Sequence, residues 1–86
     1  MLIAADELGK QLRHRRRQIG WTQQQLAERA GVARQWIVRL ERGNERAELA
    51  PILRTIFQLD LNLQLEPIDP SDELEDYVKS FARGHS

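Results

Sequence analysis

The spacing of apolar residues changes along the chain and divides it into segments. From residue 5 to residue 58 the apolar positions recur every three or four residues, which is the spacing of amphipathic helices. From Leu59 to Glu66 apolar and polar residues alternate strictly, which is the spacing of a half-buried strand, and Pro67 ends this pattern. The sequence therefore predicts an all-α fold with one C-terminal strand.

The helical part contains short helices joined by tight turns. Thr22 and Gln25 form a Thr-x-x-Gln capping box, which marks the start of a helix. Gly31 permits the positive φ that a tight turn between two helices requires. Two short helices joined in this way, in the middle of a four-helix domain, are typical of a helix-turn-helix. The helices are predicted over residues 5–19, 23–30, 33–42 and 47–58.

The alternating segment raises the question of a partner strand. Leu59, Leu61, Leu63 and Leu65 share one face of it, and no other segment of the chain has this period. A lone strand leaves its backbone donors and acceptors unpaired. We therefore predict that residues 60–67 pair with the same strand of a second copy, with the four leucines at the interface of a homodimer. The alternatives are that the segment continues the preceding helix or packs as extended chain within one subunit.

Residues 68–86 form a tail in which one more helix, over residues 71–83, is predicted. Ser71 is a suitable N-cap. Leu74, Tyr77, Val78 and Phe81 make one apolar stripe at helical spacing. This stripe either folds back on the domain or contacts another protein. With this helix included, the chain is predicted to contain four or five helices.

Charge is distributed unevenly, although the 86 residues have a formal net charge of zero. Residues 10–46 contain ten basic and three acidic side chains, a net charge of +7. Residues 47–86 contain three basic and eight acidic side chains, a net charge of −5. A basic half of this kind indicates a polyanionic partner, whereas the alternative is a solvated charged surface.

Composition argues against several functional classes. The chain has no cysteine, which excludes disulfides and thiolate metal sites, and its two histidines, His14 and His85, lack partners at metal-ligand spacing. We expect neither a metal nor a cofactor. No Gly-rich phosphate loop or nucleophile set points to an enzyme. No apolar run approaches the ~20 residues of a membrane span, and no signal sequence is evident, so we expect a cytoplasmic protein without a membrane partner.

The third helix carries the candidate base-reading residues. Because Ile37 and Leu40 are its inward pair, other positions of residues 33–42 point outward or lie at the N-terminal end that enters a major groove first. Arginine reads guanine, glutamine reads adenine, and small apolar side chains contact the thymine methyl group. The predicted base-reading set is Ala33, Arg34, Gln35, Val38 and Arg39, and the residues just past the helix, Arg42, Asn44 and Arg46, are candidate phosphate contacts.

The segment Thr22-Gln-Gln-Gln-Leu-Ala-Glu-Arg-Ala-Gly-Val-Ala-Arg-Gln-Trp-Ile-Val-Arg-Leu-Glu-Arg-Gly43 resembles the Xre/phage-repressor helix-turn-helix family. The resemblance extends from about Leu8 to Leu59 and implies a repressor-like DNA-binding domain over residues 1–59. It implies that Gln23 clamps a DNA phosphate and that the third helix contacts bases. It also implies an ion pair between Arg16 and Glu41 that fixes the third helix. Arg13, Arg15 and Arg17 remain open to phosphates or to solvent.

A fourth helix followed directly by a Leu-x-Leu-x-Leu strand is similar to the HipB-type antitoxin branch of this family. That resemblance implies strand pairing between subunits and a HipA-type kinase toxin as partner. The predicted function is a homodimeric repressor that binds a double-stranded DNA operator with two half-sites and serves as antitoxin in a toxin–antitoxin operon. The alternatives are a stand-alone regulator without a toxin and an interaction module that binds only protein.

Overall fold

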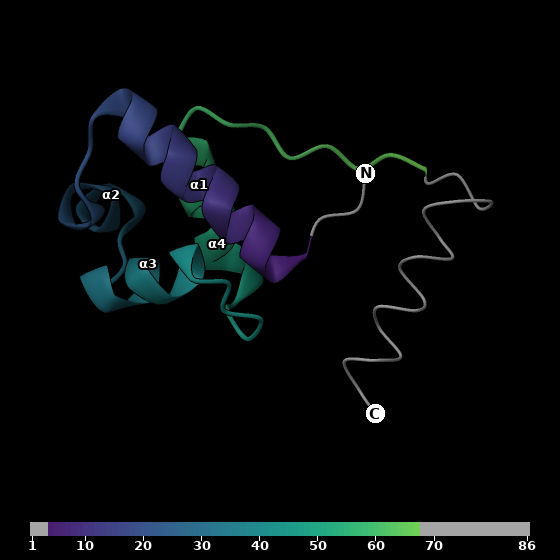
Figure 1. Cartoon of the computed structure of the whole chain (residues 1–86), viewed down its shortest axis with the longest axis horizontal. Helices are drawn as coiled ribbons and strands as arrows, with labels where there is room; N and C mark the ends of the chain where they lie inside the picture. Colours follow the sequence, from purple (N-terminus) through teal and green to yellow (C-terminus); the bar gives the residue numbers. More distant parts are fainter. Residues whose placement is uncertain (1–3, 68–86) are drawn as a thin grey trace.

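The computed structural model of the chain describes residues 4–67, which contain four α-helices. They are α1 (Ala5–Ile19), α2 (Gln23–Ala30), α3 (Arg34–Glu41) and α4 (Leu49–Gln58). These bounds agree with the helices expected from the sequence to within two residues. α2 packs against α3 and α4, and α1 packs against α3 (Figure 1). The helix expected over residues 71–83 lies outside the described residues. None of the helices within residues 4–67 is long and apolar enough to cross a membrane.

Local sequence signals account for the helix-turn-helix. The Thr22 hydroxyl accepts a hydrogen bond from the Gln25 backbone N–H at 3.1 Å, and the Gln25 side chain accepts one from the Thr22 N–H at 2.8 Å. The predicted capping box is therefore present, and it satisfies two N–H groups that the first turn of α2 leaves without helical partners. Gly31 follows α2 with φ of 71°, in the left-handed region that glycine adopts without strain.

One hydrophobic core lies where the four helices meet. Its buried members come from every helix and from the residue that follows α4: Leu12, Leu26, Ala27, Ile37, Leu40, Ile56 and Leu59. Trp21 and Trp36 are partly buried and pack against this core. Ile37 and Leu40 are the inward pair expected from the sequence, so the core fixes which side of α3 faces outward.

Gly9 allows α1 to approach the end of α3 closely. A Cβ atom at this position would lie 2.5 Å from the Leu40 carbonyl oxygen and 2.8 Å from that of Glu41. Both obstacles are backbone atoms, which move only if the helices separate. The absent side chain is therefore a condition for the observed α1–α3 packing.

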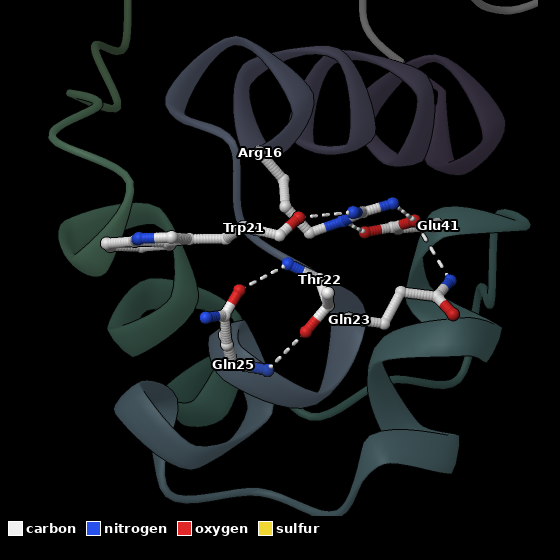
Figure 2. Close-up of polar contacts among 6 residues, drawn as sticks. All are labelled: Arg16, Trp21, Thr22, Gln23, Gln25 and Glu41. Atoms are coloured by element: carbon white, nitrogen blue, oxygen red, sulfur yellow. Dashed lines mark hydrogen bonds and ion pairs between the residues drawn. The ribbon is translucent and has the colours of Figure 1, made fainter.

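A buried ion pair joins the same two helices (Figure 2). Arg16 Nε and Nη2 donate to the two carboxylate oxygens of Glu41 at 2.7 and 3.1 Å, a bidentate geometry. Arg16 Nη1 donates to the Trp21 carbonyl oxygen at 2.7 Å, and Gln23 Nε2 donates to Glu41 Oε1 at 3.2 Å. The ion pair implied by the family resemblance is thus present, and its hydrogen bonds extend to the start of α2.

The structure corrects one part of the predicted strand. The sequence pattern places Leu59 at its beginning, but Leu59 is 0% exposed and belongs to the core. Asp60 adopts φ of 55°, and the Leu61 N–H donates to the Ile56 carbonyl oxygen at 3.1 Å. This is a Schellman-type helix end, which turns the chain away from α4. Leu59 therefore stabilises the subunit and is not available as a dimerisation residue.

Residues 61–67 are exposed, and no strand occurs within residues 4–67. Figure 1 shows this segment as an extended trace outside the helical body. A strand is defined by the ladder of hydrogen bonds to a neighbour, and residues 61–67 have no neighbouring strand among the described residues. The pairing of residues 60–67 across a dimer therefore stays a prediction.

Replacing one member of the ion pair should destabilise the domain strongly. Arg16→Met leaves the Glu41 carboxylate buried without its counter-charge, for which we expect a loss of about 3–5 kcal/mol in the free energy of unfolding. Urea denaturation followed by circular dichroism measures it. Arg13→Met, an exposed arginine on the same helix, is the control. A loss no larger than that of the control would show that the pair does not hold α1 to α3.

Gly9→Ala tests the close approach by the sign of its effect. In an exposed helix interior, replacement of glycine by alanine stabilises by roughly 0.5–1 kcal/mol. Here the added methyl group overlaps the backbone of α3, so we expect a destabilisation of about 1–3 kcal/mol. A thermal melt checks this, with Gln11→Ala on the exposed side of α1 as control. A raised melting temperature for Gly9→Ala would contradict the packing described.

Candidate nucleic-acid interface

The basic half of the chain forms a cleft on one side of the domain. The cleft has a volume of about 770 Å³ and lies between the second half of α1, the start of α2 and α3. No residue of α4 lines it. Its lining residues are Arg13, Arg16, Arg17, Thr22, Gln23, Arg34, Gln35, Val38, Glu41 and Arg42.

The charge inside the cleft is positive. Glu41 is the one acidic residue that lines it, and Arg16 neutralises this carboxylate. The other four lining arginines, Arg13, Arg17, Arg34 and Arg42, are exposed, and the ion pair within residues 4–67 does not include them. Clefts lined by one sign of charge concentrate counter-ions of the opposite sign. This cleft therefore favours an anion, and its four guanidinium groups suit the phosphates of a nucleic acid.

The outward side of α3 presents the residues expected to read bases. Arg34, Gln35 and Arg39 are exposed, and so is Ala33, which is the N-cap residue of the helix. Val38 is half-buried. Arg34, Gln35 and Val38 line the cleft, whereas Ala33 and Arg39 lie outside its lining. The set thus follows α3 along its exposed side, with three members in the lining of the cleft and two outside it.

The candidate phosphate contacts divide in the same way. Gln23 is the first residue of α2 and Arg42 directly follows α3, and both line the cleft. Asn44 and Arg46 lie in the loop that leads to α4, outside the lining. The Asn44 side-chain oxygen accepts a hydrogen bond from the Arg46 backbone N–H at 3.0 Å, which shapes this loop. Gln23 also donates to Glu41, a contact that sequence reasoning did not foresee.

Sequence reasoning placed Arg16 in an ion pair and left Arg13, Arg15 and Arg17 open to phosphates or to solvent, and the structure divides these three. Arg15 Nε donates to the Leu59 carbonyl oxygen at 2.9 Å, so this arginine is a structural residue. Arg13 and Arg17 line the cleft opposite α3. Their spacing of four residues was the available signal, because it places both on one side of a helix. The partner of Arg15, 44 residues away, could not be read from that spacing, whereas the partner of Arg16, 25 residues away, was implied by the family resemblance.

Solved structures with the same arrangement of helices include a bacterial regulator and two complexes of HipB. The restriction-modification controller protein C.AhdI from Aeromonas hydrophila is 31% identical, with a TM-score of 0.63, and the match covers 67% of this chain and 88% of that one. HipB in a HipA–HipB–O2–O3 complex and in a HipB–O4 20mer complex is 23% identical, with a TM-score of 0.73. These two matches cover 80% of this chain and 97% of HipB. No curated protein matches the chain.

A match between the sequence and a family profile identifies the family of the chain. The profile of the family described as "Helix-turn-helix domain" matches residues 7–55, which is more than half of the chain. The matched range includes α2, the glycine turn and α3 in full, together with most of α1 and α4. The family resemblance drawn from residues 22–43 is confirmed. The chain therefore belongs to the helix-turn-helix domain family of DNA-binding regulators.

Proposed function

We propose that the chain is a sequence-specific repressor that acts as the HipB-like antitoxin of a toxin–antitoxin operon. It binds a double-stranded DNA operator as a homodimer and neutralises a HipA-type kinase toxin. The observation that carries the DNA-binding part is the exposed side of α3, where Arg34, Gln35 and Arg39 adjoin a cleft of positive charge. The width of the B-DNA major groove admits a helix of this kind.

Each polar or small side chain on α3 has a role that its chemistry suggests. The guanidinium groups of Arg34 and Arg39 match the O6 and N7 acceptors of guanine, and the carboxamide of Gln35 matches N6 and N7 of adenine. Ala33 and Val38 offer apolar contact to a thymine methyl group. Contacts to the phosphates, which position the helix without reading sequence, come from Gln23, Arg42, Asn44 and Arg46.

Two exposed apolar surfaces support a homodimer. Leu61, Leu63 and Leu65 are 37%, 47% and 92% exposed, on a segment whose backbone has no strand neighbour within residues 4–67. On α4, Leu49, Leu53 and Phe57 are exposed at a spacing of four residues. Apolar groups gathered in this way mark interaction surfaces. No residue of either surface lines the cleft, so a dimer interface there uses residues other than those proposed to contact DNA. Each subunit then serves one half-site, with centres roughly 34 Å apart or a multiple of it.

The toxin partner is the finer part of the proposal. It is supported by the likeness in fold to HipB, which is bound to HipA in one of the matching structures. The second candidate function is a stand-alone regulator, and the identity of 31% to a restriction-modification controller favours it.

The two candidates predict different results in a pull-down from the native cells. The tagged chain is recovered after nuclease treatment and its bound proteins are identified by mass spectrometry. The antitoxin requires a stoichiometric kinase-like partner. Recovery of the homodimer alone would favour the stand-alone regulator.

Arg39→Ala should weaken operator binding and relax the preference at one base pair. We expect a loss of about 1–3 kcal/mol in binding free energy, because one bidentate contact to a base is removed. Fluorescence anisotropy measures the affinity on a duplex that the wild-type protein selects from random sequences and on its single-base variants. Arg29→Ala, which removes an exposed arginine of α2 outside the cleft, is the control. An unchanged base preference for Arg39→Ala would remove Arg39 from the reading set.

Leu61→Asp combined with Leu63→Asp should produce monomers that bind the operator much more weakly. Two carboxylates on the apolar side of residues 61–67 oppose their counterparts across the two-fold axis and must be desolvated there. Analytical ultracentrifugation determines the oligomeric state. Asn62→Asp combined with Gln64→Asp introduces the same charge at alternating positions and is the control. A stable, fully active dimer of the leucine variant would contradict strand pairing.

A further inference from the structure

We propose that Arg13 and Arg17 form a second anchor for the DNA backbone, on α1, across the cleft from α3. The proposal rests on DNA binding by α3 and assigns a role to a surface outside the helix-turn-helix itself. It concerns contacts to phosphate, not to bases. It gives α1 a direct share in binding, beyond holding α3 in place.

The first step is the division of the basic run on α1. Of its four arginines, Arg15 donates to the Leu59 carbonyl oxygen and Arg16 pairs with Glu41. Both side chains are therefore engaged in contacts within the subunit. Arg13 and Arg17 are exposed and line the cleft. The run therefore separates into two structural arginines and two that face a shared surface.

The second step is the position of these two side chains. A spacing of four residues on a helix places them on the same side and roughly 6 Å apart along the axis. The opposite wall of the cleft is formed by Arg34, Val38 and Arg42 from α3 and the residue after it. When α3 lies in the major groove, the surface of α1 that carries Arg13 and Arg17 faces it across the cleft. This surface then lies over the sugar–phosphate backbone that borders the groove.

The third step is the chemistry of the surface. Glu41, the acidic group in the lining, is already paired with Arg16, so that no carboxylate of the lining competes for Arg13 or Arg17. A guanidinium group matches a phosphate through two parallel hydrogen bonds. The partner expected at this wall is a row of phosphates, which the backbone of double-stranded DNA provides. Such contacts add affinity and orientation and carry no sequence information of their own.

The salt dependence of DNA binding tests this assignment. Each phosphate that is neutralised changes the slope of log K against log[salt] by about 0.9. On the duplex selected by the wild-type protein, Arg13→Gln and Arg17→Gln should each lower the steepness of that slope by about 0.9 per bound subunit, and the double variant by about 1.8. Their order of preference among single-base variants of the duplex should remain that of the wild type.

Two matched variants make the result specific. Arg13→Lys combined with Arg17→Lys keeps both charges and should keep the slope. Arg29→Gln removes an arginine outside the cleft, whose guanidinium lies 4.3 Å from the centre of the Trp21 ring, and should also keep the slope. Circular dichroism of each variant shows that the domain is folded before its binding is compared.

The failure of this inference differs from the failure of the proposed function. If the wild-type chain selects no duplex at all, both fall. If the wild-type chain binds a duplex selectively and the glutamine variants keep its slope, only the anchor on α1 is overturned. A changed base preference in these variants would overturn it as well, because it would place Arg13 or Arg17 at a base edge.

Discussion

The buried contact between Arg16 and Glu41 is the interaction on which the geometry of the domain depends. The arginine lies on α1, the glutamate ends α3, and the remaining hydrogen bonds of the pair reach the Trp21 carbonyl and the Gln23 side chain. Three elements are thereby held at one point (Figure 2). A buried charge that loses its partner costs more than the pair contributes when complete, so a tilt of α3 that separates the pair is unfavourable.

Some charged side chains of the domain, such as Arg16 and Glu41, are paired within it, and others remain available to a partner. A chain with a net charge of zero would not be expected to attract a polyanion strongly, yet its cleft contains one carboxylate and that one is compensated. Arg15 and Arg54 are likewise engaged, each with a backbone carbonyl oxygen. The four exposed arginines of the cleft belong to no ion pair within residues 4–67, so their positive charge remains available there.

Local signals made most of the fold predictable. The Thr22–Gln25 capping box and the glycine turn depend on residues adjacent in sequence, and the helical period selected Ile37 and Leu40 as the inward pair. The boundary at Leu59 was not predictable in this way, because that leucine satisfies both the helical period before it and the alternation after it. Its burial and the left-handed conformation of Asp60 decide the matter, and neither is visible in a hydrophobic pattern.

The candidate site was predictable to the same extent as the fold, in the parts that depend on residues close in sequence. The outward face of α3 follows from helix phase, and the arginines that the structure leaves exposed there were predicted. The separate fates of Arg13, Arg15 and Arg17 depend on partners distant in sequence, such as the carbonyl group of Leu59. The strand predicted over residues 60–67 does not form within the described part of the chain, and its pairing with a second copy stays a prediction.

The hydrogen bond from Arg15 to Leu59 has a consequence for the operator. It fixes the point at which residues 61–67 leave the body to the helix that also supports α3. In the proposed dimer the path from one α3 to the other therefore runs through this anchored junction in each subunit. Because B-DNA turns once in about 10.5 base pairs, inserting a single pair between the half-sites rotates one by roughly 34° relative to the other. If the proposed dimer does not follow that rotation, it selects operators by the helical phase of their half-sites as well as by their sequence.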